Sequence, residues 1–165
     1  VRSMLHVEPA LQDAEPSMMG IVEALRCVEG VSSKKIAVLL PTFEGLPVPS
    51  TITNFMAALA DLNTSITPVH CYRTSALAED DYPAVLDTLT RERTDAIALT
   101  SGGEAYVLAS LLRYAKSHDK DINIPVYSFG PYTTKCAHEA GLTISATPPH
   151  FHSFDDDVQF LVEQV

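Results

Sequence analysis

Tryptophan is absent from this chain of 165 residues, and cysteine is rare, with three residues at Cys27, Cys71 and Cys136. These cysteines are far apart, form no Cys-x-x-Cys pair and are odd in number. Their spacing argues against a disulfide framework and against a cysteine-based zinc site. It favours a reducing, intracellular setting, in which we expect Cys71 and Cys136 to be small buried side chains.

Positive charge is also scarce, since 11 Lys and Arg residues stand against 21 Asp and Glu residues, a net charge of -10. Nucleic-acid binding requires basic surface that neutralises phosphates, so we expect no nucleic-acid partner. No apolar run reaches the roughly 18 residues of a membrane-spanning helix, so we expect no membrane insertion. The chain starts at Val1 without a signal peptide, which predicts a cytoplasmic protein whose sequence begins partway through a gene product.

Short apolar segments alternate with amphipathic segments from residue 36 onward. Continuous runs rich in Val, Ile, Leu and Tyr are typical of parallel strands buried on both faces. These runs are Ile36–Leu40, Ile66–Tyr72, Ala96–Thr100, Ile124–Phe129 and Leu142–Ala146. Helices are predicted over Thr51–Leu62, from Asp80 or Asp81 onward through Tyr82 and Pro83, and over Glu104–Lys116, Thr133–Ala140 and Asp155–Gln164. The pattern predicts an α/β fold with a flavodoxin-like parallel five-stranded sheet.

The strand order 2-1-3-4-5 is favoured by Pro68, because it places the second strand at an edge, where proline is tolerated. The first 35 residues supply no sixth unit of this fold. They contain one apolar segment, Met4–Val7, and one amphipathic segment, Ser17–Val28, separated by a proline-bearing loop as at the C-terminus. We therefore expect residues 1–35 to be a strand-helix remnant of a preceding related lobe, and residues 36–165 to be the flavodoxin-like domain.

Ligands of open α/β sheets bind beyond the carboxyl ends of the strands. The loops expected there are rich in hydroxyls and glycines, as in Ser101-Gly102-Gly103-Glu104 and Gly130-Pro131-Tyr132-Thr133-Thr134. Backbone N–H groups and hydroxyls at helix N-termini suit carboxylates without many arginines. In the second loop we expect Thr133 or Thr134 to cap the helix, and Gly141 to take the left-handed conformation after it.

Plain structural explanations compete with these functional ones. Ser101–Gly103 matches no phosphate or dinucleotide motif, and a tight turn explains it equally well. Taken alone, Tyr72 is explained better as a core aromatic with its hydroxyl at the rim than as a site residue. His150 and His152 lie in a proline-rich loop, for which we favour a solvated loop over a metal site. Asp155–Asp157 is expected to charge a helix N-terminus.

Several segments resemble the uroporphyrinogen-III synthase family in order and spacing, as the C-terminal two-thirds of a member. The resemblance is carried by the apolar strand Lys34–Pro41, the Tyr-x-Thr strand end in Val69–Thr74, the Thr-Ser strand end in Asp95–Ser101, and the Gly-Pro-x-Thr pattern of Gly130–Gly141. The chain departs from the family where Gly102-Gly103-Glu104 replaces the usual Pro-Ser or Pro-Ala, and where the family's N-terminal segment is absent.

The resemblance implies a lyase of heme and porphyrin biosynthesis, which cyclises hydroxymethylbilane to uroporphyrinogen III with loss of water and inversion of ring D. It implies a small-molecule substrate and no metal or organic cofactor, and we expect a monomer. Tyr72 matches the tyrosine that assists departure of the hydroxyl, a role that suits a phenol that stays neutral at pH 7. The match implies that substrate is bound by Thr100, Ser101, Gly102, Gly130, Tyr132 and Thr133.

Two alternatives accompany this hypothesis. A catalytically silent family member would keep the fold and bind a small anion or a protein, and without an N-terminal lobe the chain alone would have little activity. A receiver or flavin domain is disfavoured, because Pro41-Thr42-Phe43 and Thr147-Pro148 supply neither the acidic residues nor the lysine of a receiver. Flavin binding is disfavoured further by the absence of tryptophan and of a hydroxyl-rich phosphate loop.

Overall fold

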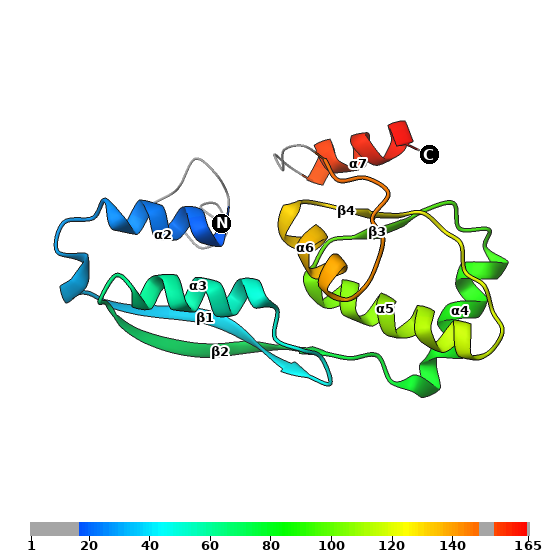
Figure 1. Ribbon diagram of the computed structural model, residues 1–165, viewed down its shortest axis with the longest axis horizontal. Helices are drawn as coiled ribbons and strands as arrows, with labels where there is room; N and C mark the ends of the chain where they lie inside the picture. Colours follow the sequence, from blue (N-terminus) through cyan, green and yellow to red (C-terminus); the bar gives the residue numbers. More distant parts are fainter. Residues whose placement is uncertain (1–16, 149–153, 165) are drawn as a thin grey trace. The chain divides into compact units, whose positions relative to one another are not determined.

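The computed structural model describes residues 17–148 and 154–164, which form two compact units (Figure 1). The first unit comprises residues 17–40 and Ser50–Cys71, and the second comprises Pro41–Pro49 and the described residues from Tyr72 onward. Within these ranges, no helix combines the length and the apolar character needed to cross a membrane.

The helices and strands follow the predicted alternation closely. The first unit has α2 (Met18–Arg26), a 3-10 turn (Val31–Ser33) and α3 (Ser50–Ala60), while β1 (Lys35–Glu44) and β2 (Ser65–Ser75) start in it and end in the second unit. The second unit has a 3-10 turn (Glu79–Asp81), α4 (Tyr82–Arg91), β3 (Ile97–Leu99), α5 (Gly102–Ser117), β4 (Val126–Ser128), α6 (Pro131–Glu139) and α7 (Phe154–Gln164). All the predicted helices and the first four predicted strands are confirmed within a few residues. The predicted segment Met4–Val7 lies outside the described residues.

Within the described residues, the strands pair as two separate two-stranded sheets, β1 with β2 and β3 with β4, so the prediction of one five-stranded sheet is wrong. β3 and β4 are parallel, with Ala98 opposite Tyr127. The fifth predicted strand, Leu142–Ala146, contributes only an isolated parallel bridge between Ala146 and Tyr127. The physical reason is that an apolar run indicates burial of a strand but does not specify which neighbour it pairs with.

β1 and β2 also run in the same direction. The Ser65 N–H donates to the Lys34 carbonyl at 3.1 Å near their starts, and the Ala76 N–H donates to the Glu44 carbonyl at 2.8 Å at their ends. Because both ends of one strand bond to the corresponding ends of the other, the pair is parallel.

The core of the first unit lies between β1 and its two helices. Val22 of α2, Val38 of β1, and Phe55 and Leu59 of α3 are buried together. Ser17 caps α2 by accepting the Gly20 N–H at 2.9 Å, as a serine before an amphipathic segment should. This packing groups α2 with β1 and α3 in one unit. The division of the chain into residues 1–35 and 36–165 stays a prediction. The origin of residues 1–35 in a related lobe stays a prediction.

β2 is far more exposed than a strand buried on both faces. All of its residues are exposed except Ile66 and Thr74, which are half-buried. Cys71 is exposed, so its prediction as a buried side chain is wrong, whereas Cys136 is fully buried as predicted. Side chains of a strand alternate between two faces, and β2 has only β1 as a hydrogen-bonded neighbour in the described chain.

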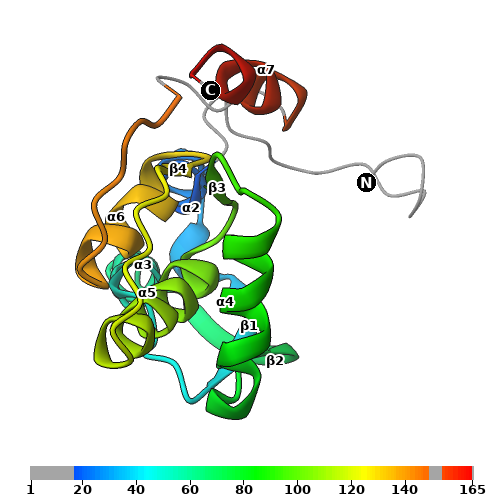
Figure 2. The ribbon, with the colours of Figure 1, turned by 90° about the vertical axis from the view of Figure 1, so that its right-hand side faces the viewer.

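The second unit is built around α5, which packs against α4 and α6 (Figure 2). β4 is buried along its whole length, in agreement with the prediction for its segment. The core combines side chains from all of these elements, namely Leu86, Leu99, Ala105, Leu108, Leu111, Val126, Cys136 and Ala137. All seven residues that the sequence suggested for the site lie in this unit.

Candidate functional site

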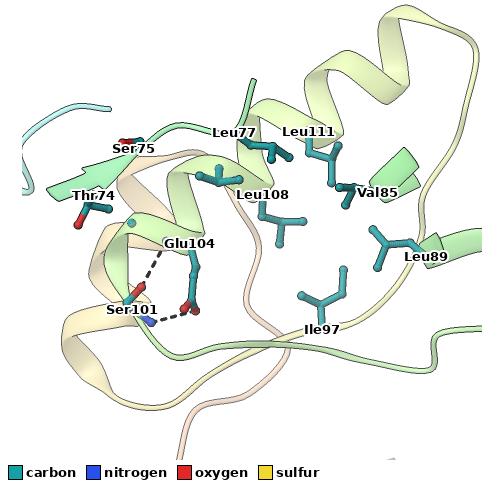
Figure 3. A pocket seen from close by; sticks show the side chains of 12 residues that line it. Thr74, Ser75, Leu77, Val85, Leu89, Ile97, Ser101, Glu104, Leu108 and Leu111 are labelled. Atoms are coloured by element: carbon teal, nitrogen blue, oxygen red, sulfur yellow. Dashed lines mark hydrogen bonds between the residues drawn. The ribbon is translucent and has the colours of Figure 1, made fainter. Parts of the chain in front are cut away.

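The loop between β3 and α5 holds Thr100 and Ser101 at the carboxyl end of β3. Ser101 is the N-cap of α5, and its hydroxyl accepts the Glu104 N–H at 3.4 Å. The Glu104 carboxylate turns back and accepts the Ser101 N–H at 3.2 Å (Figure 3). It also accepts the Thr100 N–H at 2.7 Å and the Thr100 hydroxyl at 2.9 Å. This reciprocal arrangement is a capping box, in which the serine side chain accepts the N–H of the glutamate and the glutamate side chain accepts the N–H of the serine.

The loop between β4 and α6 begins the second candidate segment. Gly130 is the N-cap of α6 with φ 154° and ψ 169°, a region that is essentially reserved for glycine, and Pro131 is the first helical residue. The prediction that Thr133 or Thr134 caps this helix is wrong, because the helix starts earlier and the Thr134 hydroxyl donates back to the Gly130 carbonyl at 2.9 Å. Gly141 has φ 86°, which confirms the predicted left-handed residue after the helix.

Three hydroxyls from separate segments meet behind this loop. Ser128 at the end of β4 lies 2.6 Å from the Thr134 hydroxyl oxygen and 2.9 Å from that of Thr147, and the two threonines lie 2.9 Å apart. Ser128 is fully buried. The group, which we call the hydroxyl triangle, ties the start of α6 to β4 and to the segment after Ala146. Sequence reasoning missed it because Thr147 is distant from Ser128 along the chain.

The two loops come close because Gly102 has no side chain. A Cβ at this position would lie 2.6 Å from the Cys136 Sγ, 3.1 Å from the Cys136 Cβ and 3.5 Å from Cε1 of Tyr132. Separations under 3.0 Å are closer than packed atoms tolerate. Glycine therefore lets the first turn of α5 lie directly against α6, and it brings Gly102 and Tyr132 of the candidate set together.

Tyr72 lies on β2, apart from that contact. Its side chain is 60% exposed, and its carbonyl accepts the Thr42 hydroxyl at 3.3 Å. Beside it, Arg73 and Glu44 form an exposed ion pair at 3.2 Å. In the described part of the chain, no hydrogen bond joins the Tyr72 phenol to the other candidate residues. Tyr72 is thus not the core aromatic that one interpretation favoured.

The remaining candidates differ in what they present to solvent. Thr100 is exposed, and Ser101 and Tyr132 are half-buried. Gly102 and Gly130 are buried, and Thr133 is only 5% exposed. The side chains of Thr100, Ser101 and Tyr132 are therefore accessible to a ligand, whereas Gly102, Gly130 and Thr133 are buried.

Tyr106 on α5 forms a contact that no sequence pattern predicts. Its hydroxyl donates to the Glu139 carboxylate of α6 at 3.1 Å. Burial, followed by the bond to Glu139 and its negative charge, raises the pKa of Tyr106 to about 12. The phenol is therefore a hydrogen-bond donor, not an acid, at neutral pH.

An open groove of about 430 Å³ lies beside α5 (Figure 3). Its wall is mostly apolar, with polar groups at the Ser101 end, and its lining includes Leu77, Val85, Leu89, Ile97, Leu108 and Leu111 together with Thr74, Ser75, Ser101 and Glu104. Among the residues that the structure describes, no lysine or arginine lines this groove. An apolar wall with a carboxylate at one end does not suit an acidic ligand.

Metal-binding residues are not clustered in the ranges that the structure describes, where no three His, Cys, Asp or Glu side chains lie close enough to share an ion. His150 and His152, for which a solvated loop was favoured, lie outside these ranges. Asp155 is exposed in the first turn of α7, where a carboxylate faces the positive end of the helix dipole.

Comparison with known proteins decides the family. A family model described as "Uroporphyrinogen-III synthase HemD" matches residues 12–155. The chain belongs to this family. A solved structure described as Thermus thermophilus Uroporphyrinogen III Synthase is similar over 85% of this chain and 54% of its own, at 14% sequence identity and a TM-score of 0.41. This chain thus spans about half of that relative. Comparison with curated proteins gave no match.

Proposed function

We propose that the chain acts as a uroporphyrinogen-III synthase, which cyclises hydroxymethylbilane with loss of water and inversion of ring D. The observation that carries this proposal is the family match over residues 12–155. Hydroxymethylbilane is the proposed substrate. A monomeric state, a cytoplasmic location and independence from a cofactor stay predictions.

Tyr72 is the proposed acid for departure of the hydroxyl group. Its phenol is 60% exposed on β2 and is therefore accessible to a ligand. A phenol can donate a hydrogen bond to a leaving oxygen without ionising at neutral pH, which suits loss of water.

The two loops at the ends of β3 and β4 are the proposed substrate-binding elements. Thr100 and Ser101 offer hydroxyls, and Tyr132 offers a half-buried phenol. Gly102 and Gly130 allow close approach of the backbone, and Thr133 contributes its position in the first turn of α6. Backbone N–H groups at two helix N-termini favour bound carboxylates.

Isomer analysis tests the activity directly. The chain is incubated with freshly generated hydroxymethylbilane, and uroporphyrinogen isomers I and III are oxidised and separated. Isomer III above the level of a heat-inactivated control is expected. Isomer I alone, which forms spontaneously, would contradict the proposal for this chain and would favour the catalytically silent alternative.

A further inference from the structure

Three donors of the β3–α5 loop are already occupied by a carboxylate from the chain itself. Both backbone N–H groups, of Thr100 and Ser101, and the Thr100 hydroxyl point to the side chain of Glu104, at distances between 2.7 and 3.2 Å. The Thr100 hydroxyl is one of the groups that the proposed function assigns to substrate, and the two N–H groups lie beside it at the start of α5. In the described structure Glu104 stands where a substrate carboxylate would bind.

A second carboxylate would meet a like charge at this position. Two negative charges held this close repel each other, and the repulsion weakens as their exposure to water increases. None of the ion pairs between described residues involves Glu104, so a cation does not offset its charge there. The chain as a whole carries a net charge of -10, which adds to the repulsion.

Displacement of Glu104 is sterically open. Glu104 is exposed, and its side chain borders the open groove beside α5 (Figure 3). Rotation of an exposed glutamate about its side-chain bonds requires no movement of the backbone and occurs on a fast timescale. The hydrogen bonds that it releases are then available to another acceptor.

We propose that Glu104 is an internal competitor for the carboxylate that the Thr100–Ser101 loop would bind, and so sets the affinity of this loop for acidic ligands. The proposal rests on the proposed function for the identity of the natural ligand. Binding of a substrate carboxylate requires the Glu104 side chain to leave the loop, and removal of its charge strengthens binding. Glu104 is in this sense a specificity-determining residue and not a catalytic one.

Acetate is the probe that tests this role without any need for turnover. The ¹⁵N-labelled chain is titrated with sodium acetate against sodium chloride at equal ionic strength, and the amide signals of Thr100 and Ser101 are followed. In Glu104→Ala we expect saturable shifts at both amides, with a dissociation constant at least about fivefold lower than in the parent chain. Glu79→Gln is the matched control, since it removes one exposed negative charge from the 3-10 turn before α4, and it should bind acetate like the parent.

Glu104→Gln guards against loss of the capping box. Its amide oxygen still accepts one N–H of the loop, so the helix start is retained while the charge is removed. If Glu104→Ala does not fold, tighter acetate binding by Glu104→Gln than by the parent supports the proposal. Equal acetate binding by the parent and the folded variants, or no binding by any of them, overturns it.

Kinetics with hydroxymethylbilane separate this inference from the activity itself. In an active chain, Glu104→Gln should lower KM at least about threefold, with kcat changed less than KM. An unchanged or higher KM would contradict the role of Glu104. If the parent forms no isomer III, the proposed function fails, while the acetate titration still decides whether Glu104 occupies the loop against carboxylates.

Discussion

The hydroxyl oxygens of Ser128 and Thr134 lie 2.6 Å apart at the junction of β4 and α6. With Thr147 they form the hydroxyl triangle, in which Thr134 also lies 2.9 Å from the Gly130 carbonyl. Four short contacts between oxygens therefore share three hydroxyl protons, because each serine or threonine has a single O–H donor. One of the four contacts therefore has no proton at any time. Thr134 takes part in three of the contacts and Ser128 and Thr147 in two each, so the three hydroxyls should differ in their importance to stability.

Ser128→Ala is expected to destabilise the chain less than Thr134→Val. Without Ser128, the Thr134 and Thr147 protons satisfy the two remaining contacts, so the loss should be at most about 1 kcal/mol. Without the Thr134 hydroxyl, the Gly130 carbonyl loses its hydrogen-bond donor, and the hydroxyl proton of Ser128 or Thr147 loses its acceptor. This should lower the free energy of unfolding by about 1–3 kcal/mol. Urea unfolding of both variants measures the difference. Thr88→Val, on the exposed side of α4, is the control, and a larger loss in Ser128→Ala than in Thr134→Val would refute this account.

Gly102→Ala should destabilise the second unit although alanine is the better helix former. The added Cβ would lie 2.6 Å from the Cys136 Sγ, and overpacking of this kind typically costs about 1–3 kcal/mol. The gain in helix propensity, up to about 1 kcal/mol, offsets only part of this loss. Unfolding free energies of Gly102→Ala, Cys136→Ala and the double variant form a cycle. We expect the double variant to be more stable than the sum of the single losses predicts, and strict additivity would show that the contact is not the cause.

The helices and the first four strands were predictable because their signals are local. Amphipathic spacing and apolar runs mark where an element begins and ends, within a few residues. Pairing of the strands was not predictable in the same way. The run at Leu142–Ala146 resembles the other strands in composition, yet only Ala146 pairs, in one bridge with Tyr127. Which strands become neighbours depends on contacts between distant segments, which composition does not encode.

The candidate site shows the same limit at single residues. The Ser101-x-x-Glu104 spacing is the sequence signature of a capping box, so the occupancy of the Thr100–Ser101 loop by Glu104 was open to prediction and was missed. The contact of Tyr106 with Glu139 has no such signature, because the two residues lie 33 positions apart in sequence and on different helices. Burial of Thr133 likewise follows from the packing of α6 in the second unit and not from its neighbours in sequence.

Neighbouring residues of β1 should respond very differently to truncation. Val38 is 8% exposed and packs under the helices of the first unit, whereas Leu39 points to the opposite face and is 67% exposed. We expect Val38→Ala to lose about 2 kcal/mol, because it leaves a cavity in the core. Leu39→Ala should change the free energy of unfolding by less than about 0.5 kcal/mol. Denaturant unfolding of the two variants provides the comparison, and similar losses would contradict the assignment of faces in β1.

Tyr106 gives a pH dependence at the alkaline end. Its pKa is about 12 in the folded chain and 10.0 in its ordinary state. Because the pKa is higher in the folded chain, the contribution of Tyr106 to the free energy of unfolding is complete below pH 10. This contribution is lost as the pH rises toward 12. Tyr106→Phe should therefore lose less stability than the parent over this range. The free energy of unfolding of the parent and of Tyr106→Phe is measured at pH 9, 10 and 11, and the difference between them isolates Tyr106 from the other titrating groups. A difference that does not change with pH would rule out its contribution.

Tyr72→Phe tests the proposed acid on β2. The variant keeps the ring, and because the phenol is 60% exposed, the fold should be unaffected. Loss of general acid catalysis typically lowers a rate by about 10²–10⁴-fold, so the rate of isomer III formation should fall by at least roughly a hundredfold with little change in KM. Tyr114→Phe is the matched control, since Tyr114 packs against Tyr82 and His118 and is not among the proposed site residues. An active Tyr72→Phe variant would remove this phenol from the reaction and would assign the departing hydroxyl to another donor.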